Sequence, residues 1–402
     1  MITSANVPSQ NRHATEHATQ VRLIEQALDA IDAGSPPLTE SFTRNNPAVY
    51  TSREWAERER ATLFHDFPLV AGFSSQVRNP GDYFTDELGP TPLLVVRGED
   101  GVLRAFANIC RHRGSRLAHG SGRTGARFVC PYHSWSYDTE GRLRAIPDDF
   151  GFAHLDRESH GLVQFPVAER YGMVWVTPRT DGEIDLDIHL ELLARDLESC
   201  GLEDFELRER RVVRRRMNWK LVSDTFWEAY HIKFLHRTTI APMFVRNLAL
   251  FDPFGLCHRL VGIRTSIEKL RGLPPERWDL LPHATILMNL FPNTVFVMQS
   301  DHAEAYRIYP APDNPSESVT EINVLGPAGA AADRYERRWG LPGAPGWDKV
   351  MELLVGVVEQ DFEVGETIQR NFETGVLSNV FYGRYEPALE HFHDSIRAAL
   401  GE

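Results

Sequence analysis

Two short segments of this 402-residue chain each place a cysteine close to a histidine. Cys110 and His112 form the first pair, and Cys130 and His133 form the second, with seventeen residues between the pairs. Thiolates and imidazoles are common ligands of iron and zinc in proteins. This donor set is what a [2Fe-2S] cluster requires when histidine replaces cysteine on one of its two irons. The spacing therefore predicts a site for one-electron transfer.

A structural zinc site is the main alternative for these four residues. Such a site usually pairs cysteine with cysteine and histidine with histidine, whereas here each pair is mixed. Chance is a second alternative, because the chain has 16 histidines and 4 cysteines. The neighbouring Gly114 and Pro131 favour the cluster, since such residues let backbone amides turn toward cluster sulfurs.

A second set of candidate ligands lies in the aromatic-rich segment 224–236. His231 and His236 are five residues apart, which places them about 140° out of phase on a regular helix. We therefore expect the helix to loosen or kink between them. Glu228 precedes His231 by three residues and shares its face, so it can orient that imidazole or bind a metal itself. The alternative is a helix with two exposed histidines.

Two histidines and one carboxylate, with open coordination positions, are typical of non-haem Fe(II) sites that activate oxygen. The carboxylate can come from a distant segment. The acidic, helix-like segment 357–370 is the best candidate. It also fits an amphipathic surface helix with Val358, Phe362 and Ile368 facing the core. A ligand would then lie at the edge of that apolar stripe.

The spacing of apolar residues predicts the helices and strands around these candidate ligands. Residues 14–33 show a helical stripe of Val21, Ile24, Leu28 and Ile31. From about 45 to 165 short β-type segments alternate with turns, and a strand precedes Cys110. Residues 120–125 match G-x-G-x-x-G, but no helix follows them, so we expect a flexible turn and no nucleotide site.

Composition restricts the class of protein. Hydrophobic residues make up 42% and charged residues 25%, as in ordinary globular proteins, and no apolar run approaches the ~20 residues of a membrane span. The absence of a targeting signal predicts a cytoplasmic protein. The net charge of -13 argues against nucleic-acid binding. Cys200 and Cys257 are expected to be small buried residues and not a disulfide.

Five segments together resemble a known family, the alpha subunits of Rieske non-haem iron oxygenases. Residues 110–114 and 130–135 resemble the two halves of the Rieske motif. Residues 218–220 and 228–236 resemble the N-W-K and E/D-x-Y-H-x4-H motifs of the catalytic domain. Residues 360–361 match the late acidic pair of the family. The resemblance covers the chain from about residue 45 to its last residue.

The resemblance implies a role for each candidate residue. It implies two metal centres: a cluster bound by Cys110, His112, Cys130 and His133, and a mononuclear Fe(II) bound by His231, His236 and Asp361. Glu228 would be the carboxylate that bridges the two centres, and we place Asp224 with it among the catalytic residues. In the family the subunits form a head-to-tail ring, so Glu228 would contact His133 of the next subunit.

The resemblance also implies a fold and an organisation. We expect an α+β protein with an N-terminal helical segment (1–44), an all-β Rieske domain (45–170) and a catalytic domain (171–402). The catalytic domain would have a helix-grip, START-like fold around an antiparallel sheet. A homotrimer is expected, either alone or with a small beta subunit. A separate reductase, with or without a ferredoxin, would supply electrons from NAD(P)H.

The expected activity is hydroxylation of a small organic substrate with O2, with an aromatic compound or aromatic acid as the first candidate. Two features differ from the ring-dihydroxylating enzymes: the bridge is Glu228 where they have Asp, and residues 381–393 resemble the carnitine and choline monooxygenase branch. A monooxygenase or N-dealkylase of quaternary amines is therefore the alternative. An electron carrier without oxygenase activity is an alternative of another class.

The substrate pocket is expected from residues between 240 and 310. Arg246 or Arg264 would pair with the carboxylate of an aromatic acid. The apolar candidates are Met243, Phe244, Val245, Phe251, Phe254, Met288, Leu290, Phe291, Phe296 and Met298. Each of these also fits the core of a curved sheet.

Overall fold

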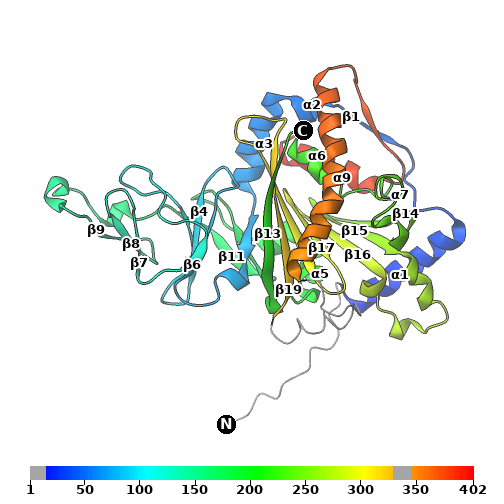
Figure 1. The fold of residues 1–402 in the computed structure, drawn as a ribbon, viewed down its shortest axis with the longest axis horizontal. Coiled ribbons are helices and arrows are strands. Elements are labelled where there is room, and N and C mark those ends of the chain that lie inside the picture. Colours follow the sequence, from blue (N-terminus) through cyan, green and yellow to red (C-terminus); the bar gives the residue numbers. More distant parts are fainter. Residues whose placement is uncertain (1–14, 329–345) are drawn as a thin grey trace, which may run out of the picture.

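The structure is a computed structural model that describes residues 15–328 and 346–402. Along the sequence, the described helices lie near the start, in the middle and near the end of the chain (Figure 1). They are α1 (His17–Ala33), α2 (Ala48–Thr51), α3 (Arg53–Asp66), α4 (Leu186–Leu190), α5 (Leu193–Ser199), α6 (Trp219–Asp224), α7 (Ile232–Leu235), α9 (Trp347–Glu373) and α10 (Pro387–Ala399). None of these described helices has the length and apolar character needed to cross a bilayer.

Residues 69–176 form three small antiparallel sheets, which we call the β domain. The five-stranded sheet has the order β10 (Gln164–Phe165), β5 (Leu103–Ala107), β4 (Leu93–Arg97), β3 (Asp82–Asp86), β6 (Ser121–Arg123). The second sheet contains β11 (Val167–Arg170), β12 (Met173–Val176) and β2 (Leu69–Phe73), and the third contains β7 (Arg127–Val129), β8 (Ser136–Asp138) and β9 (Leu143–Ala145). The third sheet lies at the far tip of the molecule (Figure 1).

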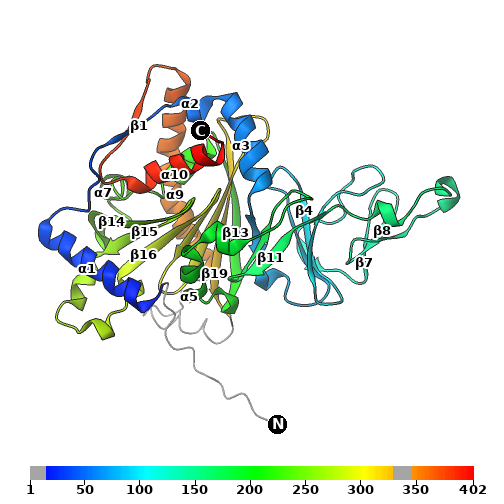
Figure 2. The same cartoon turned by 180° about the vertical axis from the view of Figure 1, so that it is seen from behind.

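The remainder is organised around a seven-stranded antiparallel sheet, and we call it the sheet domain. Its order is β13 (Phe205–Arg215), β19 (Ser318–Pro327), β18 (Ala303–Pro310), β17 (Thr294–Met298), β16 (Ala284–Leu290), β15 (Cys257–Arg264), β14 (Phe244–Phe254). A separate two-stranded ladder pairs β1 (Thr43–Asn45) with β20 (Val380–Tyr382). Helix α9 crosses the sheet in Figure 1, whereas α10 and α1 lie nearer the viewer in Figure 2. The predicted α+β fold with antiparallel sheets is confirmed.

The predicted domain boundaries stay a prediction at the start of the chain. Helices α2 and α3 fall within the range assigned to the Rieske domain, and their Tyr50 and Phe64 are buried in a cluster that includes residues of both the large sheet and the β domain. The first helix begins at His17, and Ile24 and Leu28 of the predicted stripe are buried in it. Val21 and Ile31 are half-buried instead, and Leu23 and Ala27 complete the buried face. Residues 1–14 of the predicted segment lie outside the described residues.

Two smaller predictions can be compared with the structure. Residues 121–123 of the glycine-rich segment form the edge strand β6, which pairs with β3 and is followed by β7, so the expected turn is partly a strand. Cys200 and Cys257 are both buried free thiols, as predicted.

A buried ion network joins the two domains. Arg307 on β18 donates to the Val70 carbonyl of the β domain at 2.6 Å, to Glu321 at 2.7 Å and to the Asp86 carboxylate. Arg307, Asp86 and Glu321 are at most 3% exposed. Charges buried this deeply are tolerated because they compensate one another.

Replacing Arg307 with methionine should lower the free energy of unfolding by about 3–5 kcal/mol, because it leaves Asp86 and Glu321 buried without their cation. The measurement is the midpoint of urea denaturation followed by tryptophan fluorescence. Arg277→Met, at an exposed position, is the matched control. Equal midpoints for the two variants would contradict a stabilising role for the network.

Candidate metal centres

The two cysteine–histidine segments form loops with the same backbone pattern. In the first, Gly114 N–H donates to the Cys110 carbonyl at 2.9 Å, and Cys110 N–H donates to the Ser115 carbonyl at 2.8 Å. In the second, Ser134 N–H donates to the Cys130 carbonyl at 2.9 Å, and Cys130 N–H donates to the Trp135 carbonyl at 2.8 Å. Gly114 and Ser134 both have positive φ, of 78° and 56°, which closes each turn.

The side chains of these loops converge. Cys110 and Cys130 are each 2% exposed, whereas His133 is exposed and His112 is half-buried. The two imidazole rings lie 4.7 Å apart between centroids. Burial would raise the pKa of Cys130, but hydrogen bonds from the backbone amides of Tyr132 and His133 outweigh it and lower that pKa. Two inner thiols and two outer imidazoles fit a Rieske-type [2Fe-2S] cluster.

A second set of ligand atoms meets between α7 and α9. His231 lies immediately before α7, His236 immediately after it, and Asp361 lies in the middle of α9. The Nε2 atoms of His236 and His231 are 3.0 and 3.5 Å from Asp361 Oδ1. Three ligand atoms within 4.8 Å of one another can hold a single metal ion. The short helix between the histidines lets both rings face the same point.

Each imidazole is oriented through its other nitrogen. His231 Nδ1 is hydrogen-bonded to the Glu228 carboxylate, and His236 Nδ1 lies 2.9 Å from Gln360 Oε1. These contacts assign the proton to Nδ1 and turn Nε2 toward Asp361. Burial alone would lower the pKa of His231, and the Glu228 carboxylate raises it above its ordinary value. The sequence indicated Glu228 but not the contact between Gln360 and His236, which joins residues 124 positions apart.

These three ligands form part of the wall of a cavity of about 470 Å³. Most of its lining is apolar and comes from α7, α9 and the sheet, including Ile232, Leu260, Leu287, Val297, Leu354 and Val358. Such a cavity, with a few polar groups in its wall, is typical of sites for small organic molecules.

One end of the cavity carries a buried polar cluster. Glu304 accepts hydrogen bonds from Tyr306 at 2.6 Å and Gln299 at 3.0 Å, and it lies 3.3 Å from His302. His302 also contacts Asp301 at 2.8 Å. Burial alone would lower the pKa of His302, but these carboxylates raise it to about 9. His302 is therefore a cation at neutral pH.

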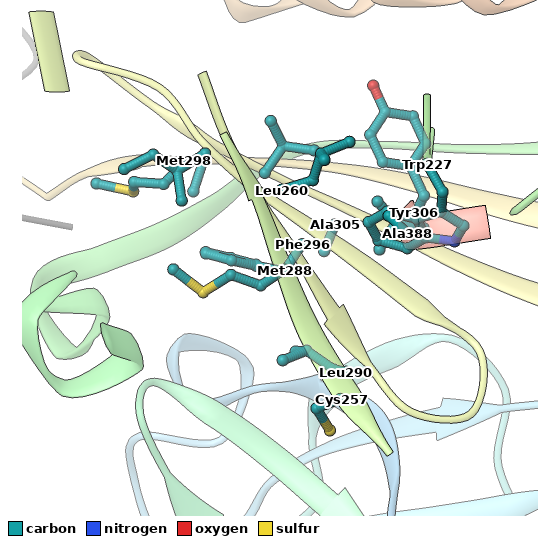
Figure 3. Close-up of a cluster of buried hydrophobic side chains, with 14 of the residues drawn as sticks. Trp227, Cys257, Leu260, Met288, Leu290, Phe296, Met298, Ala305, Tyr306 and Ala388 are labelled. Carbon is teal, nitrogen blue, oxygen red and sulfur yellow. The ribbon is translucent and has the colours of Figure 1, made fainter. Parts of the chain in front are cut away.

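Several residues predicted to line the substrate pocket do not line the cavity. Met243 and Phe244 line the cavity, as does Arg264, whereas Arg246 is exposed at the surface. Met288, Phe296 and Met298 belong to the packed core shown in Figure 3. Because side chains alternate along a strand, they face away from Leu287 and Val297, which line the cavity.

Asp224 does not join the metal ligands. Its carboxylate accepts a hydrogen bond from Tyr50 at 2.7 Å and lies 3.0 Å from His393 Nε2. Tyr50 also contacts Tyr382 at 3.0 Å. Asp224 lies in a polar network that ties α6 to α2 and α10, because it ends α6 on the side of the helix that faces Tyr50. Its catalytic role stays a prediction.

Comparison with family models gives two matches. Residues 202–402 match the model of the ring hydroxylating alpha subunit (catalytic domain), and residues 67–154 match that of the Rieske [2Fe-2S] domain. The cysteine and histidine loops and the three clustered ligands fall inside these two ranges.

Curated relatives include enzymes named for the quaternary amines glycine betaine, carnitine and choline. The glycine betaine monooxygenase oxygenase subunit of Pseudomonas aeruginosa is 32% identical over 196 residues, which cover 49% of this chain and 45% of the relative. The chain thus spans less than half the length of that relative. The chloroplastic choline monooxygenase of Beta vulgaris is 26% identical, over 97% of this chain and 81% of the relative.

Solved structures share the fold. A quaternary ammonium Rieske monooxygenase in complex with L-carnitine has a TM-score of 0.74 at 21% identity, over 91% of this chain and 96% of that one. A naphthalene 1,2-dioxygenase variant bound to phenanthrene has a TM-score of 0.71 at 20% identity, over 91% of this chain and 94% of that one. At these identities the likeness concerns the fold alone.

Proposed function

The chain belongs to the family of ring hydroxylating alpha subunits, and we propose that it is the terminal oxygenase of a multicomponent Rieske non-haem iron system. The observation that carries this proposal is the position of His231, His236 and Asp361 in the wall of a largely apolar cavity. A chain that only carried electrons would need no such cavity. The β domain supplies the ligand set for the electron-transfer cluster.

The proposed reaction inserts one oxygen atom of O2 into a C–H bond of the substrate and reduces the other to water, with two electrons and two protons. Fe(II) bound by the three ligands would supply the oxygen-binding and redox chemistry. The chain orients the two imidazoles through Glu228 and Gln360 and holds the substrate against the metal. Apolar side chains such as Leu260, Val297 and Val358 keep water from the reacting carbon.

Two substrate classes are candidates. Relatives named for glycine betaine, carnitine and choline favour a quaternary amine, as does Glu228 at the position where ring-dihydroxylating enzymes have Asp. Phe226 and Tyr306, whose rings are 4.6 Å apart in the cavity wall, offer aromatic faces to a cation. An aromatic acid is the second candidate, because the cavity is mainly apolar and contains Arg264.

Electron supply and assembly complete the proposal. A separate NAD(P)H-dependent reductase, with or without a ferredoxin, would reduce the cluster, whose histidine ligands lie at the surface of the β domain. We also propose a head-to-tail homotrimer in which the cluster of one subunit reduces the iron of the next.

The test is metal analysis combined with product analysis. Purified protein should contain three irons per chain, two in the cluster and one mononuclear. With NADH, a reductase and ¹⁸O2, one labelled oxygen atom should appear in a product formed from a panel of quaternary amines and aromatic acids, detected by mass spectrometry. Two irons per chain, together with NADH consumption and no labelled product across the panel, would instead identify an electron carrier.

A further inference from the structure

Three ionisable side chains follow one face of β18 along the wall of the cavity. His302 immediately precedes the strand, and Glu304 and Tyr306 are its second and fourth residues. Alternate residues of a strand share a face and lie about 7 Å apart, and all three of these side chains line the cavity. The intervening Ala305 and Arg307 face the other side of the sheet, toward the packed core and the β domain.

Polar contacts link the three side chains into a continuous row. The Tyr306 hydroxyl donates to Glu304 Oε2 at 2.6 Å, and His302 Nε2 lies 3.3 Å from Glu304 Oε1. Each oxygen of the carboxylate therefore faces one of the other two members. Gln299 donates to Oε1 at 3.0 Å and holds the carboxylate in this position.

The two ends of the row have different surroundings. The outer end, His302, lies in the turn between β17 and β18 and is 9% exposed, whereas Glu304 and Tyr306 are 3% and 2% exposed. The inner end is Tyr306, whose pKa is raised by burial, by Glu304 and also by the negative charge of Asp361. The row therefore leads from the edge of the sheet, near solvent, to the part of the cavity that contains a metal ligand.

The protonation states suit the movement of a proton along this row. Burial would lower the pKa of His302, but Asp301 and Glu304 raise it to about 9, so the imidazole is protonated at neutral pH. The raised pKa of Tyr306 keeps its hydroxyl protonated as well. Burial would raise the pKa of Glu304, but hydrogen bonding and the charge of His302 lower it overall. A proton acceptor thus lies between two proton donors.

We propose that His302, Glu304 and Tyr306 form a relay that delivers protons from solvent to the reacting oxygen atoms in the cavity. This inference rests on the proposed oxygenase function, because insertion of one oxygen atom and reduction of the other to water consumes two protons and two electrons. The electrons come from the reductase through the cluster. The row supplies the protons, one at a time.

Each transfer begins at the inner end of the relay. Tyr306 gives its hydroxyl proton to oxygen in the cavity, and the phenolate takes a proton from Glu304. Glu304 has taken that proton from His302 on one carboxylate oxygen and passes it on after the carboxyl group rotates. The neutral His302 then recovers a proton from solvent. Two such transfers complete one turnover, with Tyr306 as the catalytic residue and the other two acting through it.

The first measurement is the pKa of His302 in the iron-loaded holoenzyme without turnover. Exchange of the imidazole C2 hydrogen for deuterium, followed by mass spectrometry over a series of pH values, reports each histidine separately. We expect a pKa of about 9 in the wild type. In Glu304→Gln we expect a value lower by at least about one pH unit, because the raised pKa depends on that carboxylate.

The rate of the reaction with O2 should follow the same pKa. His302 can donate only while it is protonated, so the wild-type rate should fall as pH rises through about 9. Two carboxylates flank His302, and the cavity wall also carries two cations from other elements. These groups are Asp301 of the same turn, Glu304 of β18, Arg264 of β15, which is hydrogen-bonded to Gln299, and Lys349 of α9.

The second measurement separates proton delivery from a structural role. In a single turnover with O2 and a reduced cluster, Tyr306→Phe should slow formation of the labelled product by at least about 100-fold. Hydrogen peroxide added to the oxidised holoenzyme brings both electrons and both protons, since one peroxide and one substrate give one hydroxylated product and one water. With peroxide, Tyr306→Phe should therefore match the wild type. Glu304→Gln should show the same loss with O2 and the same recovery.

Tyr309→Phe is the matched control. It removes one buried hydroxyl from the same strand, but Tyr309 lies on the other face of the sheet, where it accepts a hydrogen bond from Arg307 at 3.0 Å. No change is expected with either oxidant. Cluster absorbance and the unfolding midpoint show that each variant is folded.

Three outcomes would overturn the relay alone. They are a pKa of His302 below 7 in the wild type, an unchanged O2 reaction in Tyr306→Phe, or an equal loss with O2 and with peroxide in that variant. Failure of the oxygenase function is distinguishable, because the wild type itself would then form no labelled product with either oxidant. That result would refute the oxygenase and the relay together.

Discussion

Asp361→Ala should contain two irons per chain instead of three and should form no hydroxylated product. Asp361 Oδ1 lies within 3.5 Å of both histidine Nε2 atoms, so its removal leaves two neutral ligands and no negative charge. Loss of an outer residue that only orients a ligand already costs about 10- to 100-fold in metal affinity. Loss of a direct ligand should cost more than about 100-fold, which metal analysis and titration with Fe(II) measure.

Glu363→Ala is the matched control for this variant. Glu363 lies two residues away on α9 and is exposed, so it shares the helix but not the cavity. It should keep three irons and full turnover. The [2Fe-2S] absorbance should be unchanged in both variants, because the cluster lies in the other domain. Full coupled turnover in Asp361→Ala would refute its assignment as a ligand.

The sequence predicted the ligands of one metal centre more directly than those of the other. The loops around Cys110 and Cys130 could be predicted because four ligands fall in two short segments, where spacing alone brings them together. Asp361 lies 125 residues after His236, so only the resemblance to the family, and not periodicity, selected it from the acidic segment 357–370. The contact of Gln360 with His236 depends on how α9 crosses the sheet.

The sequence predicted only in general terms how the rings of His231 and His236 come to face the same point. Five residues on a regular helix would separate the rings by about 140°. The structure ends the helix instead: α7 spans only Ile232–Leu235, and the two histidines flank it. His236 has φ of -93° and ψ of 26°, outside regular helical geometry, which turns its ring back toward Asp361.

The cavity was the least predictable part. Ten apolar residues between 243 and 298 were candidates, and most of those on the sheet face its packed core. Whether a strand residue faces a cavity or the core depends on the register of the strands, and a shift of one residue reverses every side chain. Arg264 was one of two arginine candidates, and only the register of β15 against β16 places it over Thr285 and Gln299.

The arrangement of the domains bears on the route of the electron. The loops that hold the cluster ligands lie in the β domain, whose far tip is at one end of the long axis of the molecule (Figure 1). Of the two helices that hold the mononuclear site, α7 lies beside β14 at the end of the large sheet opposite that tip, and α9 crosses the sheet. In the proposed ring, the cluster of one subunit would face the mononuclear site of the next.

Glu228→Gln should keep three irons per chain but lower the rate of electron transfer to the mononuclear site by at least about 100-fold. The glutamine carbonyl can still accept from His231 Nδ1, so the imidazole stays oriented, but the negative charge between the centres is lost. A single-turnover experiment measures this rate, with the cluster reduced beforehand and its reoxidation by O2 followed by absorbance in the presence of substrate. Glu363→Gln serves as the control, with no change expected. Unchanged single-turnover kinetics in Glu228→Gln would refute the bridging role, whereas loss of the third iron would show that Glu228 holds the metal site together.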